Sequence, residues 1–310
     1  MEGILSQQHL IPSGFGAKTT AREAIGNRRL DGKTAIVTGG YAGIGVETTR
    51  VLAAAGAQVI VPARDLAKAR KAIGELANVS IEPMDLAAPP TIDAFVQRFG
   101  DRPLHLLINN AGIMAAPFSR DARGLESHLA VNHVGHFQLF IRLVPALRRA
   151  RGARVIALSS RGHVRSAFDF DDPDFERRPY EKMVAYGQSK TANVLFAVEA
   201  DRRHQSEGIR AFALHPGAIL ETDLARNYDP EELKRVVERA LRIGSFKTVE
   251  QGAATTIFCA TSPLLDGLGG VYCENCDVAP IKNEGDDGVR PYAIDPDAAK
   301  RLWAWTERFI

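Results

Sequence analysis

The stretch that decides the fold is Thr34-Ala-Ile-Val-Thr-Gly-Gly-Tyr-Ala-Gly-Ile-Gly45, an apolar run that passes directly into a glycine-rich loop. An amphipathic segment follows, which predicts a strand, a tight turn and a helix in that order. Glycines at such a junction let the backbone approach a bound diphosphate, and the helix N-terminus adds free N–H groups and partial positive charge. The spacing is Gly-x-x-x-Gly-x-Gly, so it differs from the Gly-x-Gly-x-x-Gly fingerprint.

A glycine-rich turn without a ligand is the alternative interpretation of this motif taken alone. The strand before it and the helix after it favour dinucleotide binding. The candidate contacts in the loop are Gly39, Tyr41, Ala42, Gly43, Ile44 and Gly45.

Beyond the loop, short runs rich in Val, Ile and Leu alternate with longer amphipathic stretches, which is typical of βαβ units. Seven strands are expected, at residues 34–38, 58–63, 79–84, 105–108, 154–158, 210–214 and 270–273. Helices are expected at residues 45–55, 66–76, 91–99, 124–148, 183–205, 230–242, 249–260 and 296–309. We therefore predict an α/β fold, a single doubly wound (Rossmann) domain with a seven-stranded parallel sheet flanked by helices.

This domain is expected to occupy residues 31–310, with residues 1–30 as an N-terminal extension packed on it. The segment near 220–248 is longer than an ordinary connection and mixes apolar with charged residues. Because insertions at strand ends are where substrate sites lie, we expect this segment to form a substrate lid over an apolar pocket.

Composition narrows the possible partners. The chain has 310 residues, 45% of them hydrophobic and 25% charged, with a formal net charge of +2. That balance excludes nucleic acid or an anionic membrane as the main partner and leaves a small molecule. The first thirty residues lack a signal-peptide pattern, and no apolar run approaches the roughly 20 residues that span a bilayer. With three cysteines, the chain is expected to be a reduced, cytoplasmic protein.

The end of the second strand bears on the choice of cofactor. It reads Pro62-Ala-Arg-Asp65, and Ala63 stands where an acidic residue would hold an unphosphorylated ribose. Arg64 can neutralise a 2′-phosphate instead. NADP(H) is therefore favoured over NAD(H), although an arginine near a strand end is also a common solvated charge.

A tyrosine and a lysine four residues apart, Tyr186 and Lys190, fall on one face of a predicted helix. The lysine cation favours the phenolate and is expected to lower the pKa of the tyrosine, which would then exchange a proton near neutral pH. Taken alone, such a pair is more often a structural surface couple. Ser160 follows the fifth strand and Asn110 the fourth, both at carboxyl ends where ligands bind open α/β sheets.

With these motifs in this order, the sequence resembles the short-chain dehydrogenase/reductase family over about residues 30–278. The resemblance is carried by residues 38–45, 85–86, 109–112, 132, 160, 186–190 and 215–217. It is closest to the retinol-dehydrogenase-like branch and its soluble bacterial relatives, through residues 131–136, the long spacing from Ser160 to Tyr186, and residues 185–196. Membrane members of that branch usually have an apolar anchor, a pattern not found here.

The resemblance implies a catalytic tetrad. Tyr186 would exchange the proton with the carbonyl or hydroxyl oxygen, and Ser160 would hydrogen-bond the same oxygen. Lys190 would bind the nicotinamide ribose and bias Tyr186 toward its anion. Asn132 would hold a water that joins Lys190 to solvent.

Further cofactor contacts are implied in the same way. Asp85 and Leu86 would lie beside the adenine, and Ile219 would lie against the carboxamide. Asn110 would lie near the adenosine ribose. The other implied contacts are Ala111 and Gly112 after the fourth strand, and Pro216 and Gly217 after the sixth. Residues 216–222 are one residue longer than usual, so a role for Thr222 is left open.

The expected function is an NAD(P)-dependent oxidoreductase that interconverts a carbonyl and an alcohol on a small to medium, largely apolar substrate. The alternatives are an NAD-dependent alcohol dehydrogenase and a non-catalytic NADP redox-sensing protein. No metal site is expected, because Cys273-Glu-Asn-Cys276 lacks a second ligand pair. The resemblance also suggests a homodimer or homotetramer.

Overall fold

The central sheet has its strands in the order β3-β2-β1-β4-β5-β6-β7-β8. The structure is a computed structural model, and it describes residues 7–242 and 246–310. The strands are β1 (Thr34–Val37), β2 (Gln58–Ala63), β3 (Val79–Pro83), β4 (Leu106–Asn109), β5 (Ala153–Leu158), β6 (Ile209–His215), β7 (Val271–Glu274) and β8 (Asp277–Val278). The chain winds outward from β1 to β3 and then returns to place β4 on the other side of β1. This reversal is the topological switch point at which open α/β sheets bind ligands.

Strands β1 to β7 are all parallel, which confirms the predicted sheet. The count differs by one, because β8 turns back antiparallel to β7. Asn275 and Cys276 form the two-residue turn between them, with φ of +55° and +62°, the backbone that tight hairpins require. A two-residue strand is too short to produce a hydrophobic pattern, and the Cys273–Cys276 spacing reflects this hairpin.

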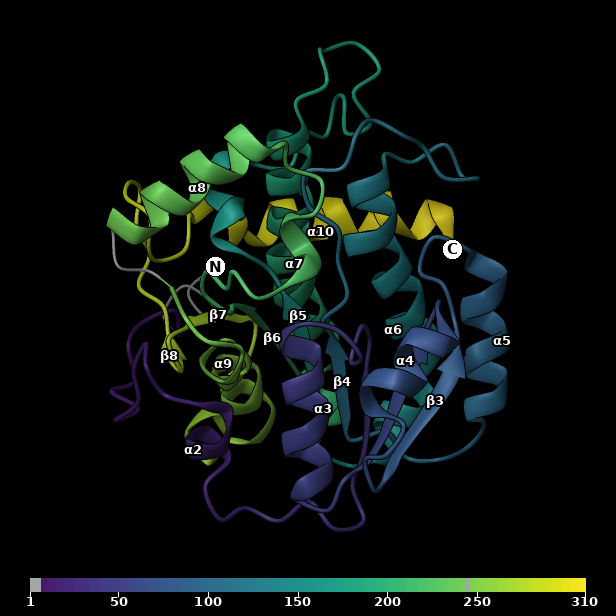
Figure 1. Ribbon diagram of the computed structural model, residues 1–310. Coiled ribbons are helices and arrows are strands. Elements are labelled where there is room, and N and C mark those ends of the chain that lie inside the picture. The colour runs from purple at the N-terminus through teal and green to yellow at the C-terminus, as the bar shows by residue number, and fades with distance from the viewer. Residues whose placement is uncertain (1–6, 243–245) are drawn as a thin grey trace.

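Helices cover both faces of the sheet (Figure 1). They are α2 (Ala21–Ile25), α3 (Ile44–Ala54), α4 (Leu66–Ile73), α5 (Pro89–Phe99), α6 (Gly135–Arg149), α7 (Lys182–His204), α8 (Pro230–Arg242), α9 (Val249–Thr261) and α10 (Pro296–Thr306). One hydrophobic cluster joins α2, α3, α4 and α9 to the sheet, and a second joins α5, α6, α7 and α10 to it. The central strands are thus covered on both faces by apolar side chains, as parallel strands require, whereas the edge strand β3 is only partly buried.

The helix expected over residues 124–148 starts later than predicted. Residues around Gly124 form a turn, because the Asp121 carboxylate accepts the N–H groups of Arg123 and Leu125. The helix then opens with a π-helical segment, η1 (Leu129–Val134), before α6 continues it. Such π-helical turns are rare and often lie at functional sites.

The N-terminal segment follows the β7–β8 edge of the sheet. The Gln8 side chain donates to the carbonyl oxygens of Tyr272 and Ala279 and accepts from the Tyr272 N–H. The Asp277 carboxylate accepts N–H groups from Ile11 and Ser13. Residues 1–6 of the expected extension lie outside the described residues.

The segment expected as a lid contains a short 3-10 helix, η4 (Asp223–Ala225), and the longer α8. Figure 1 shows α8 at the end of the molecule toward which the strand arrows point. Residues 243–245 of this segment lie outside the described residues. Within the described ranges, no helix has both the length and the apolar character needed to cross a bilayer.

Candidate active site

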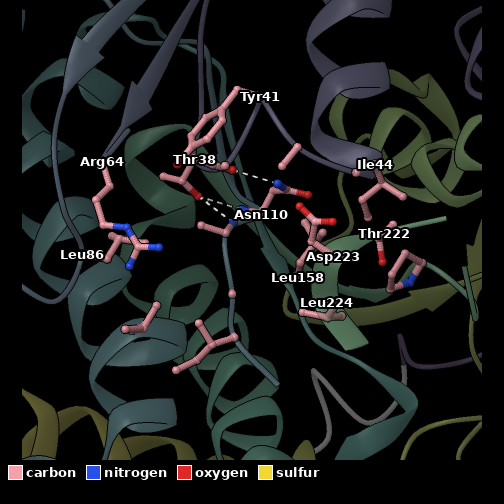
Figure 2. Close-up of a pocket in the computed structure, with 18 of the residues that line it drawn as sticks. Thr38, Tyr41, Ile44, Arg64, Leu86, Asn110, Leu158, Thr222, Asp223 and Leu224 are labelled. Carbon is pink, nitrogen blue, oxygen red and sulfur yellow. Dashed lines mark hydrogen bonds between the residues drawn. The ribbon is translucent and has the colours of Figure 1, made fainter. Parts of the chain in front are cut away.

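A cavity of about 460 Å³ lies at the carboxyl ends of the central strands, where the strand order reverses. Figure 2 shows Arg64 and Leu86 on one side of it and Ile44 and Thr222 on the other. The lining residues come from the glycine loop and from the ends of β2, β3, β4, β5 and β6, with further residues from α7 and η4. The cavity thus gathers segments that are far apart in the sequence.

The glycine loop approaches the end of β4 too closely for side chains. A Cβ atom on Gly39 would lie 3.0 Å from the Cα of Ala111, and one on Gly45 would lie 2.2 Å from the Gly39 oxygen. Gly39 also has φ of +63°, which favours glycine. Helix α3 begins directly after Gly43 with no side-chain cap. This arrangement suits an anionic group at the helix N-terminus.

The Thr38 side chain fixes the crevice between β1 and β4. Its Oγ1 accepts the N–H groups of Asn110 and Ala111 at 2.9 and 3.0 Å. In return, Asn110 Nδ2 donates to the Thr38 carbonyl oxygen at 2.8 Å, as Figure 2 shows. These hydrogen bonds hold the start of the glycine loop against the end of β4, the two segments that would face a dinucleotide.

Positive charge gathers at the end of the cavity formed by β2. Arg64 is exposed there and lines the cavity, together with Lys68 and Arg226. The Asp65 carboxylate caps α4 by accepting the Lys68 N–H at 3.0 Å. Lys68 Nζ lies 2.8 Å from Asp223 Oδ2 and thereby links α4 to the lid segment. Because Asp65 is engaged as a helix cap, its carboxylate is less available to a ribose hydroxyl.

Tyr186 lies at the base of the cavity near the start of α7 and is 3% exposed. Burial raises its pKa to about 12, while the Ser160 hydroxyl opposes that rise. The lowering of this pKa that was expected from Lys190 is not found, because burial raises the pKa and the opposing contribution comes from Ser160. Ser160 Oγ accepts the N–H of Gly162 at 3.0 Å. A Cβ atom on Gly162 would meet the Tyr186 ring at 2.7 Å, so the serine turn packs directly on the tyrosine.

Lys190 is buried one helical turn beyond Tyr186. Its Nζ donates to the Leu158 carbonyl oxygen at 3.0 Å and lies 5.6 Å from the centre of the Tyr186 ring. Asn193 Nδ2 donates to the same oxygen at 2.9 Å. Burial lowers the pKa of Lys190 to about 8. The position of Asn193 in the site could not be predicted from the sequence, because its partner is a main-chain atom 35 residues away.

Asn132 lies on η1, is fully buried and stands behind the cavity wall. Its Oδ1 accepts the Ile113 N–H at 2.8 Å, and its Nδ2 donates to the Ile113 oxygen and to Ser189 Oγ, both at 3.0 Å. Both ends of the amide are therefore engaged. A water held by Asn132 would bond to its main-chain carbonyl.

Every candidate residue other than Asn132 and Gly45 lines the cavity. These lining residues are Gly39, Tyr41, Ala42, Gly43, Ile44, Arg64, Asp85, Leu86, Asn110, Ala111, Gly112, Ser160, Tyr186, Lys190, Pro216, Gly217 and Ile219. Thr222, whose role was left open, also lines it, and its Cγ2 lies 3.0 Å from where a Gly43 Cβ would stand.

Several lining residues were not named as candidates, among them Lys68, Asp223 and Arg226. Lys68 follows Arg64 by four residues, a spacing that could have been noticed. Asp223, Leu224 and Arg226 lie in the segment 220–248 that was expected to cover the pocket, but their position beside α4 could not be predicted, since only the fold brings them there.

The lid segment is also fastened on the other side of the cavity. Asn227 Nδ2 donates to the Met114 oxygen at 2.9 Å, and the Tyr228 hydroxyl donates to Met183 Sδ at 3.0 Å. Lys182 pairs with Glu232 on α8. The lid thus contacts both the loop after β4 and the start of α7, where Tyr186 lies.

The described residues hold no group of three or more His, Cys, Asp or Glu side chains placed to bind a metal ion. Cys259, Cys273 and Cys276 are all buried as free thiols.

Comparison with known proteins agrees with this geometry. The sequence profile of the short chain dehydrogenase family matches residues 33–233. A Streptomyces lividans protein named "Probable oxidoreductase" is 44% identical, over 89% of this chain and 97% of its own. Mouse retinol dehydrogenase 12 is 37% identical, over 89% of this chain and 86% of its own. A solved Pseudomonas aeruginosa structure, the RhlG/NADP active-site complex, is 28% identical, with a TM-score of 0.63 and coverage of 79% and 94%.

Proposed function

Because this chain belongs to the short-chain dehydrogenase/reductase family, whose members are NAD(P)-dependent oxidoreductases of alcohol and carbonyl groups, we propose its finer function. It interconverts a carbonyl and an alcohol on a small to medium, largely apolar molecule, with NADP(H) as the preferred cofactor. One observation carries this proposal: a single cavity holds the glycine loop together with Ser160, Tyr186 and Lys190.

Tyr186 is the proton donor in carbonyl reduction. With a pKa raised to about 12 by burial, its hydroxyl is protonated at neutral pH and can give its proton to the developing alkoxide. The bound nicotinamide supplies the hydride, or accepts it in the reverse direction. Ser160 hydrogen-bonds the reacting oxygen, and the Lys190 cation stabilises the phenolate left on Tyr186.

The NADP(H) preference is supported by the charges beside β2. Arg64 lines that end of the cavity, where a 2′-phosphate needs a cation, and Lys68 lies in the same lining, where it pairs with Asp223. Asp65, the acidic residue next to Arg64, is engaged as the cap of α4. The NADP complex of the Pseudomonas relative lends further support. The residues that fit the cofactor are thus the chain's own glycine loop and this basic end.

An apolar substrate is supported by the lid segment. Leu224 lines the cavity, and Leu220, Val236 and Leu241 are exposed apolar side chains on the same segment. Large exposed apolar side chains on a segment that also lines a pocket favour a binding role for that segment. For the assembly we propose a homodimer or homotetramer, which size-exclusion chromatography with light scattering would measure.

Isotope transfer tests the proposed reaction. The protein is incubated with NADPH carrying deuterium at C4 of the nicotinamide, in each prochiral form, and a panel of apolar aldehydes and ketones. We expect deuterium from one form alone to appear on the carbinol carbon of the product. Alcohol formed without deuterium from either labelled form would contradict direct hydride transfer, and the absence of any product with NADPH or NADH would contradict the proposed activity.

A further inference from the structure

We propose that His136 is a positioning residue for proton transfer in this site, because it bridges the end of β1 to the backbone of Asn132. The inference rests on the proposed function and adds a residue to it. His136 lies at the start of α6, is 3% exposed, and does not line the cavity. Its two ring nitrogens hydrogen-bond to two different elements.

The first bond is to Thr38. His136 Nε2 lies 2.8 Å from Thr38 Oγ1, which already accepts the N–H groups of Asn110 and Ala111. Since the hydroxyl oxygen is taken up as an acceptor, its own hydrogen is available to donate. The carbonyl of Ile108 lies farther away, at 3.4 Å. Nε2 is therefore the acceptor, and Thr38 the donor.

The second bond follows from the first. A neutral imidazole that accepts at Nε2 carries its hydrogen at Nδ1. His136 Nδ1 lies 3.0 Å from the Asn132 carbonyl oxygen and so donates to it. Burial, with a smaller contribution from the Lys190 cation, lowers the pKa of His136 to about 4, so the ring is neutral at physiological pH.

This bond matters because the Asn132 side chain is already engaged by Ile113 and Ser189. The main-chain carbonyl is then the part of Asn132 that is left to hold the water expected to join Lys190 to solvent. A Cβ atom on Gly112 would lie 3.2 Å from Asn132 Oδ1 and 3.4 Å from Lys190 Nζ, so these groups meet around one glycine. His136 holds that carbonyl at a fixed position relative to Thr38, where the glycine loop begins.

Asn132 lies in the π-helical segment η1, which the hydrogen bond from His136 helps to stabilise. Such segments are rare and occur mostly as single turns within α-helices. A bond from His136 to Asn132 stabilises the segment next to Val131, which lines the cavity, while Thr38 holds the other side of the ring. Loss of the ring would loosen Asn132 without removing any group that touches a cofactor or substrate.

His133 is a matched control one turn earlier. It too is buried, and its ring packs near Phe137 and Phe196. Its Nε2 bonds to Thr306 Oγ1 on α10 at 2.8 Å, not to Asn132 or Thr38. The two histidines therefore share burial and helix but differ in what they hold.

The kinetic test compares His136→Phe, His136→Asn and His133→Phe with the wild type. For His136→Phe we expect kcat to fall about 10- to 100-fold, the KM for NADPH to change less than about twofold, and the solvent deuterium isotope effect on kcat to rise. His136→Asn, whose amide can replace Nδ1 as donor, should recover part of the loss. His133→Phe should lower the melting temperature and leave the isotope effect unchanged. Equal kcat and isotope effects in the wild type and His136→Phe would overturn the proposal.

A second measurement does not depend on turnover. Nitrogen-15 NMR of histidine-labelled wild-type protein, with resonances assigned by the two variants, should show His136 with hydrogen on Nδ1. Hydrogen on Nε2 would overturn the proposed bridge. If the wild type reduced no carbonyl, the proposed function would be contradicted. The NMR measurement of the His136 tautomer would still test whether His136 links Thr38 to Asn132.

Discussion

Lys190 Nζ lies 3.0 Å from the carbonyl oxygen of Leu158, and this hydrogen bond fixes the cation at the carboxyl end of β5. The cation therefore reaches Tyr186 through space, across the 5.6 Å that separates Nζ from the centre of the tyrosine ring. Burial lowers the pKa of Lys190 to about 8. The amine that the mechanism needs in its charged form therefore loses its proton only slightly above neutral pH.

We predict that activity falls as the pH rises through about 8. Lys190 loses its proton above its lowered pKa, and the neutral amine no longer stabilises the Tyr186 phenolate. Lys190→Met should lower kcat/KM by roughly 100-fold or more. The measurement is a pH profile of kcat/KM from pH 6 to 10. Lys300→Met, on the exposed side of α10, is the control; a profile flat to pH 10 in the wild type would contradict the role of the cation.

Ser160→Ala should reduce kcat about 100- to 1,000-fold, in line with the loss of one hydrogen-bond donor to a developing oxyanion. The hydroxyl also opposes the raised pKa of Tyr186, so its removal should raise that pKa further. Steady-state kinetics with one carbonyl substrate would check this. Ser166→Ala, which removes an exposed hydroxyl after the same turn, should retain nearly full activity. Equal losses in both variants would point to damage of the turn.

Arg64→Ala should weaken NADPH binding by about tenfold or more and leave NADH binding unchanged, because only NADPH carries the 2′-phosphate. Fluorescence titration of both cofactors would measure this. Arg70→Ala removes an exposed arginine of the nearby helix α4 that does not line the cavity, so it is the control. If Arg64→Ala weakened both cofactors equally, or neither, the NADP(H) preference would lose its main support.

Much of this site was predictable because local patterns determine it. Residues 34–45 combine an apolar strand with glycines that only a tight turn explains, and parallel strands bring their carboxyl ends to one edge wherever the order reverses. The Tyr186 and Lys190 spacing needs only helical periodicity. From these features the sheet and most of the residues around the cavity could be predicted.

Other features could not be predicted because they depend on contacts between distant segments. Lys68 and Asp223 are 155 residues apart, and the fold alone brings them together. The π-helical start of α6 differs from an α-helix by one hydrogen-bond register, which hydrophobic periodicity does not resolve. The raised pKa of Tyr186 follows from burial, which no spacing reveals.

The protein should lose stability as the pH falls from about 6.5 to 4. Burial lowers the pKa of His163 to about 4, and its Nε2 accepts the Arg290 N–H at 3.3 Å, so the folded state keeps the ring neutral. In the unfolded chain His163 binds a proton near pH 6.5, whereas in the folded state it stays neutral down to about pH 4. His163 alone should therefore lower the free energy of unfolding by about 3 kcal/mol over this range. Urea unfolding at several pH values would measure the slope.

His163→Gln removes this titration and should make the decline less steep, although its starting stability would be lower. His9→Gln, at an exposed position, should leave the slope as it is. A slope that is the same in the wild type and His163→Gln would show that His163 is not held neutral.

The central claim is that Tyr186 donates the proton in an NADPH-dependent carbonyl reduction. NADPH oxidation by the wild type and by Tyr186→Phe, measured against the same panel of apolar aldehydes and ketones, tests it most directly. We predict turnover by the wild type that falls at least about 100-fold in the variant, with NADPH binding preserved. Turnover that survives the loss of the hydroxyl would contradict the account.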